Sequence, residues 1–133
     1  MTPQKLKKKL DNLYNKYNRR KYVHPDPLEF LYSYKEIRDR EIVGLIASSL
    51  AYGRVAQILK SVSFVLDKMN PSPFIFLKDS DYKSIYNAFD DFKHRFAGSG
   101  ELAALLLGIK TVINRFGSLH ECFLAGFSKD DET

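Results

Sequence analysis

Residues 39–57, with the sequence DREIVGLIASSLAYGRVAQ, constrain the fold of this chain more than any other segment. The stretch from Asp39 to Tyr52 is apolar nearly all round, which is typical of a helix buried among other helices. Gly53 interrupts it, because glycine readily takes the left-handed conformation that ends many helices. A helical pattern resumes after Arg54. The segment therefore predicts two neighbouring helices joined by a turn of about two or three residues.

The rest of the chain has the helical period, and no strand-like alternation is found. Helix starts are marked by capping residues and prolines, with Thr2, Asp26, Asp39, Ser99 and Ser118 as the predicted caps. The expected helices cover residues 3–18, 27–34, 39–52, 54–69, 73–77, 80–89 and 100–116, followed by one that starts after Ser118. We therefore expect an all-α fold, an orthogonal bundle of six to eight helices.

Small side chains recur along one face of the helix expected over residues 39–52. Gly44, Ala47, Ser48 and Ala51 form this stripe. Small residues let another backbone come close, and the short turn makes the following helix the expected partner. The alternative partner is a ligand or a nucleic-acid backbone.

The length of 133 residues suits one domain. We expect a single helical domain over residues 1–133. The last expected helix has barely begun to bury Phe123, Leu124 and Phe127 when the sequence ends. We therefore also expect the chain to be shorter at its C-terminus than the other members of its family.

The compartment is predicted from cysteine content and hydropathy. Cys122 is the only cysteine, so neither an internal disulfide nor a cysteine-based zinc site is possible, and a reducing compartment fits. No apolar run approaches the ~20 residues of a membrane-spanning helix. No apolar segment follows the basic residues near the N-terminus, so a secretory signal is not expected. We predict a cytoplasmic protein with no membrane partner.

Positive charge is concentrated near the N-terminus. Residues 1–24 contain eight Lys or Arg against one acidic residue, a net charge of +7, whereas the remaining residues have a net charge of −2. A local basic helix can contact phosphate groups. The candidates in this region are Lys7, Lys8, Lys9, Arg19 and Arg20. The alternative is a solvated helix face with no ligand.

The turn around Gly53 is the second candidate site. Tyr52 and Arg54 flank the glycine, and Gln57 lies one helical turn further on. An aromatic ring can stack on a nucleic-acid base while a guanidinium group binds phosphate. In the alternative interpretation, Tyr52 packs on a neighbouring helix and Arg54 is only solvated.

No pattern for a cofactor, a metal or a catalytic centre is present. The glycine-rich phosphate-binding motifs are absent, as is a nucleophile elbow. His24, His94 and His120 have none of the spacings typical of metal ligands. We therefore expect no cofactor and no metal, and the sequence leaves the catalytic residues unknown.

Two segments resemble a bacterial family of conserved hypothetical proteins of unknown function. They are YVHPDPLEFLYSY, residues 22–34, and DREIVGLIASSLAYGRVAQILKSV, residues 39–62. The members of that family are longer than this chain. The resemblance implies a conserved helical fold and names no activity.

A second, weaker likeness is to the helix-hairpin-helix DNA glycosylases. Residues 26–31 are similar to the segment that leads into a buried helix there, residues 41–49 to that helix, and Ala51-Tyr52 to the turn that inserts a wedge into the duplex. The wedge is usually a glutamine, so this chain departs from the pattern. The DNA-gripping hairpin and the catalytic aspartate segment of that superfamily are absent. The likeness implies the first lobe of a bilobal protein, without its catalytic residues.

These observations give a leading function and an alternative. The leading expectation is the wedge lobe of a DNA glycosylase-like scaffold that contacts DNA through phosphate groups and serves DNA binding or repair. This chain alone is expected to be inactive as an enzyme. The alternative is a non-enzymatic helical module that binds a protein. A scaffold without autonomous activity is the third possibility.

Overall fold

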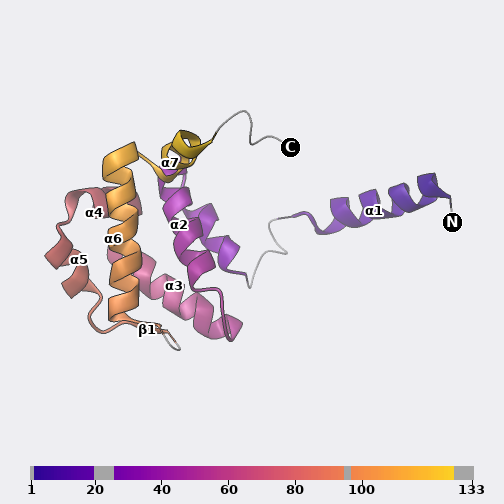
Figure 1. Cartoon of the computed structure of the whole chain (residues 1–133). Coiled ribbons are helices and arrows are strands. Elements are labelled where there is room, and N and C mark those ends of the chain that lie inside the picture. Colours follow the sequence, from indigo (N-terminus) through magenta and orange to yellow (C-terminus); the bar gives the residue numbers. More distant parts are fainter. Residues whose placement is uncertain (1, 20–25, 95–96, 128–133) are drawn as a thin grey trace.

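The computed structural model describes residues 2–19, 26–94 and 97–127. Within them the chain forms seven α-helices, one 3₁₀ helix and a short two-stranded ladder, which confirms the all-α prediction. The elements are α1 (Pro3–Tyr17), η2 (Pro27–Ser33), α2 (Ile37–Ser49), α3 (Val55–Met69), α4 (Pro73–Asp79), α5 (Tyr82–Ala88), β1 (Lys93–His94), β2 (Ala97–Gly98), α6 (Ser99–Phe116) and α7 (Leu119–Gly126). We call the part after α1, residues 26–94 and 97–127, the body (Figure 1).

One hydrophobic core lies between α2, α3 and α6. Ile42, Ile46, Val62, Val65 and Leu106 are completely buried in it. α6 packs against α4, α5 and α7, while α2 packs against η2 and α4 (Figure 1). Apolar stripes of helices in the body therefore meet in one core.

Several predicted caps are confirmed. Thr2 accepts a hydrogen bond from the Lys5 amide at 3.3 Å, and Asp26 accepts one from the Leu28 amide at 2.8 Å. Ser118 caps α7, whose Glu121 amide donates to its hydroxyl oxygen at 3.0 Å. The prediction that Ser99 caps α6 is wrong, because α6 begins one residue earlier than predicted, at Ser99, and Gly98 is its N-cap residue.

Asp39 does not cap α2, as the sequence suggested. α2 begins two residues before Asp39, and the buried carboxylate is turned toward the start of α4 instead. It accepts hydrogen bonds from the Ser72 hydroxyl at 2.6 Å and from the Phe74 amide at 3.0 Å. The first amides of a helix have no partner within it, and the Asp39 carboxylate of α2 accepts one of them at the start of α4. These hydrogen bonds link α2 to the start of α4, more than thirty residues after Asp39 in the sequence.

The small-residue stripe of α2 faces η2, and the prediction that α3 covers it is wrong. A Cβ atom placed on Gly44 would lie 3.6 Å from the Leu31 side chain of η2. Ala47, Ser48 and Ala51 line an open groove shared with Pro27 and Leu28 at the start of η2. The 3₁₀ helix η2, and not α3, is therefore the element that packs against the small side chains of α2.

α1 differs from every other helix, because each of its residues is exposed and none belongs to the core. Figure 1 shows it standing apart from the body. No single helix in the described part of the chain is long and apolar enough to cross a membrane; α6 and α7 together have the length and composition, with a 67° bend between them.

Candidate functional site

The turn between α2 and α3 is the centre of the candidate site. α2 ends at Ser49, and Gly53 has a φ of 97°, the left-handed conformation that the sequence predicted. Arg54 is the residue before the first turn of α3, and its side chain makes no capping hydrogen bond. Gly53, Arg54 and Gln57 are exposed, whereas Tyr52 is half-buried.

A mutual contact between Tyr52 and His94 holds this turn against β1. The Tyr52 hydroxyl donates a hydrogen bond to the His94 carbonyl oxygen at 2.9 Å. In return, Nε2 of His94 lies 3.2 Å from the Tyr52 carbonyl oxygen. The two rings meet edge to face, with their centroids 4.6 Å apart. We call this pair of residues the clasp.

Hydrogen bonds connect the clasp to α3 through the buried Ser61 and the exposed Gln57. The Ser61 hydroxyl lies 2.7 Å from Nδ1 of His94, and the Gln57 side-chain amide donates to Ser61 at 3.2 Å. A carbonyl oxygen can only accept, so Nε2 of His94 carries the proton that points at Tyr52. In the neutral ring Nδ1 then accepts from Ser61. Within the described residues no buried side-chain nitrogen or oxygen lacks a hydrogen-bond partner, so the first role of this network is to fix the turn.

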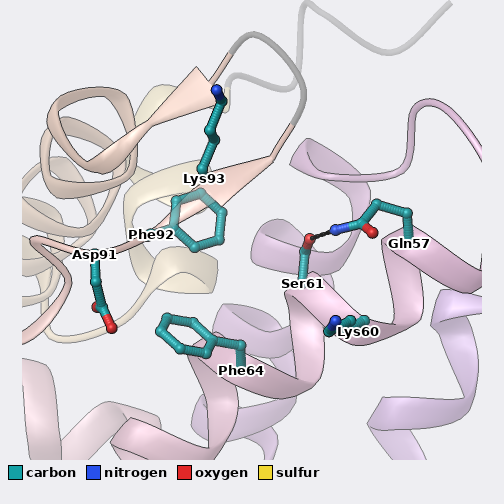
Figure 2. A pocket seen from close by; sticks show the side chains of 7 residues that line it. All are labelled: Gln57, Lys60, Ser61, Phe64, Asp91, Phe92 and Lys93. Carbon is teal, nitrogen blue, oxygen red and sulfur yellow. Dashed lines mark hydrogen bonds between the residues drawn. The ribbon is translucent and has the colours of Figure 1, made fainter.

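An open pocket lies beside this network, between α3 and the segment that enters β1 (Figure 2). The rings of Phe64 and Phe92 form its apolar wall, with centroids 6.1 Å apart. Lys60 and Lys93 line the same pocket and are exposed. The carboxylate of Asp91, also in the lining, is 3.2 Å from the Lys68 ammonium group. The charged residues that line the pocket are Lys60, Lys93 and Asp91, so its net charge is positive.

The structure brings part of the predicted site together. Tyr52, Gly53 and Arg54 lie in the α2–α3 turn, and Gln57 lies in the first turn of α3. Lys7, Lys8 and Lys9 lie on α1, which Figure 1 shows well apart from that turn. Arg19 lies just beyond α1, where its Nε donates to the Asn15 carbonyl oxygen at 3.3 Å. Arg20 falls outside the described residues. The described candidates thus fall on two separate surfaces of the structure.

Most of the chain matches the model of one known protein family. Residues 26–133 match the model of a family described as Protein of unknown function (DUF2400). The chain belongs to this family. The DUF2400 match contains the turn, α3 and both strands, whereas α1 precedes it. No curated protein and no solved structure matches the chain. The prediction of a conserved family of unknown function is confirmed, and the family description names no activity.

Sequence reasoning missed His94, Ser61, Lys60 and Lys93. His94 had no motif around it, and it meets Ser61 and Tyr52 only because the chain folds back across more than thirty residues. Lys60 follows Gln57 by three residues, so helical spacing alone could have placed both on one face of α3. Within the residues that the structure describes, no three His, Cys, Asp or Glu side chains gather as a metal site would require.

Replacing Gly53 with Val should destabilise the fold by about 1–3 kcal/mol, because a β-branched residue is strained at positive φ. Urea denaturation followed by circular dichroism measures the change. Gly53→Asn is the control, since asparagine tolerates the left-handed region and should cost clearly less. Equal losses for the two variants would contradict the assigned conformation of the turn.

Proposed function

We propose that this DUF2400 protein binds the phosphate backbone of nucleic acid through the surface around the α2–α3 turn. We define this turn surface by Arg54, Gln57, Lys60 and Lys93. The observation that carries the proposal is the placement of three exposed cationic side chains around a turn whose backbone is fixed by the clasp. A preformed turn avoids much of the ordering cost that a mobile loop would add on binding.

The backbone of α3 supports the same proposal. The first amides of a helix have no partner within it, and the positive end of the helix dipole points the same way. Arg54 offers these amides no side-chain acceptor. A phosphate group near Arg54 would therefore meet amide donors as well as a guanidinium group, which is a common arrangement for anions.

In the proposed function Tyr52 has a positioning role. Its hydroxyl is bonded to His94 and its ring packs against the imidazole, so the side chain helps to hold the turn. Arg54, Lys60 and Lys93 then make contacts with phosphate and not with base edges. Such contacts orient a protein on nucleic acid without reading its sequence. The proposed binding is accordingly insensitive to sequence, as suits a scaffold for DNA binding or repair.

The alternative function, a helical module that binds a protein, has its own supporting observation. Phe123 and Phe127 of the α7 region stack with centroids 6.3 Å apart, although they are 68% and 45% exposed. A paired aromatic surface of this kind suits a protein partner. It lies on a different element from the turn surface, so the two proposals can be tested separately.

The test of the proposed function is the affinity of the full chain for a short DNA duplex, measured by fluorescence anisotropy. Replacing Arg54, Lys60 and Lys93 together by Ala should weaken binding by about tenfold or more, since each phosphate contact adds to the affinity. The matched control replaces Lys35, Lys83 and Arg115, three exposed cations on other parts of the body. Equal losses for the two triple variants, or no binding by the unmodified chain, would contradict the proposal and favour the protein-binding alternative.

A further inference from the structure

We propose that α1 is an interfacial helix that binds the surface of an anionic lipid bilayer. The inference goes beyond the proposed function, because it concerns a different element and a different partner. It starts from the exposed apolar face of α1. Leu6, Leu10, Leu13, Tyr14 and Tyr17 are each between 49% and 65% exposed.

The five apolar residues occupy one side of α1. On a helix that turns about 100° per residue they lie within an arc of ~100°, which is the width of a typical buried face. No residue of α1 is buried against the body. The helix also lies outside residues 26–133, the part of the chain that matches the DUF2400 family model.

The charges of α1 decide which partner fits this face. Lys5, Lys9 and Lys16 lie along one edge of the apolar arc, and Lys7 lies along the other. Asp11 is the only acidic residue of the helix, and its carboxylate is 3.0 Å from the Lys7 ammonium group. A second copy of α1 would place lysines against lysines, which opposes a dimer through this face. A partner that fits α1 therefore has an apolar region that receives the leucine and tyrosine side chains and negative charges beside it that pair with the lysines.

An anionic bilayer provides both features. Leucine and tyrosine side chains can enter the boundary between headgroups and acyl chains, while lysines at the edges extend their ammonium groups to lipid phosphates. Tyrosine favours this interface, because its ring is apolar and its hydroxyl remains in contact with water. Contact with DNA would use the lysines alone and leave Leu6, Leu10, Leu13 and Tyr14 exposed to water. This proposal departs from the prediction of no membrane partner, which was based on the lack of a spanning helix and a signal sequence.

The experiment measures co-sedimentation of the full chain with vesicles. We expect binding to vesicles of phosphatidylcholine and phosphatidylglycerol in equal parts, and little binding to phosphatidylcholine alone. Replacing Leu6, Leu10 and Leu13 by Ser keeps the charge, and replacing Lys5, Lys9 and Lys16 by Gln keeps the apolar face. Each triple variant should lose about tenfold or more in affinity, because apolar burial and charge attraction both contribute. The matched control for the leucines replaces Ile37, Ile75 and Tyr82, three exposed apolar residues of the body, by Ser.

A fluorescence reporter gives an independent measurement. The chain contains no tryptophan, so Leu13→Trp introduces a single emitter on the apolar face of α1. Its emission should shift to shorter wavelength with the mixed vesicles and stay unchanged with phosphatidylcholine or a DNA duplex. Three results would overturn the proposal: full binding by the leucine variant, equal binding to neutral and anionic vesicles, or a response to duplex DNA alone. None of these residues belongs to the turn surface, so failure here would leave the proposed function standing.

Discussion

Replacing His94 with Ala should lower the free energy of unfolding by about 2–4 kcal/mol, because it combines a lost buried ring with lost hydrogen bonds. The side chain is 1% exposed and fills the space between Tyr52 and Ser61. Its removal leaves the Ser61 hydroxyl without its acceptor and the Tyr52 carbonyl oxygen without its donor. Urea denaturation of the full chain measures the loss.

Two further variants make this result specific. His120→Ala is the same chemical change at an exposed position, and it should alter stability by less than about 0.5 kcal/mol. Tyr52→Phe removes only the hydroxyl of the clasp and should cost about 0.5–1.5 kcal/mol. If His94→Ala were as mild as His120→Ala, the clasp would not hold the turn.

Asp39→Ala should cost about 2–4 kcal/mol, since it removes a buried carboxylate with two hydrogen bonds at the start of α4. The carboxylate accepts from Ser72 and from the Phe74 amide, and Asp39 itself is only 7% exposed. Without it the Phe74 amide has no acceptor and α2 loses its polar link to α4. Thermal and urea unfolding should both show the loss.

The control for Asp39 is Asp91→Ala, in which an exposed carboxylate loses its ion pair with Lys68. A surface pair of this kind is worth about 0–1 kcal/mol. Asp39→Asn keeps an oxygen acceptor and should fall between the two. A double-mutant cycle with Ser72→Ala should give a coupling above about 0.5 kcal/mol, as expected of residues in contact. Additive losses would show that the contact contributes nothing.

Local signals in the sequence predicted most of the fold. Helix starts at Thr2, Asp26 and Ser118 were readable because a capping side chain bonds to an amide two or three residues away. The turn at Gly53 was readable because glycine favours positive φ. Each of these features depends on a few neighbouring residues, so it can be predicted from a single sequence without knowledge of the tertiary structure.

The features that the sequence did not predict depend on contacts between distant residues. Asp39 reads as a local cap, and its acceptance of hydrogen bonds from Ser72 and Phe74 requires knowing how α4 is placed. His94 reads as an isolated histidine for the same reason. The short ladder of β1 and β2 has only two residues in each strand, too few for an alternating pattern. The contact of His94 with Tyr52 and the position of Lys93 beside the turn were hidden in this way.

The salt dependence of DNA binding tests the central claim most directly. The logarithm of the affinity should fall linearly with the logarithm of the salt concentration, by about 0.9 per phosphate contact. Replacing Arg54, Lys60 and Lys93 by Ala should reduce that slope by about 2–3, while the control variant at Lys35, Lys83 and Arg115 keeps it unchanged. A slope that is the same for the unmodified chain and the turn-surface variant would contradict the account.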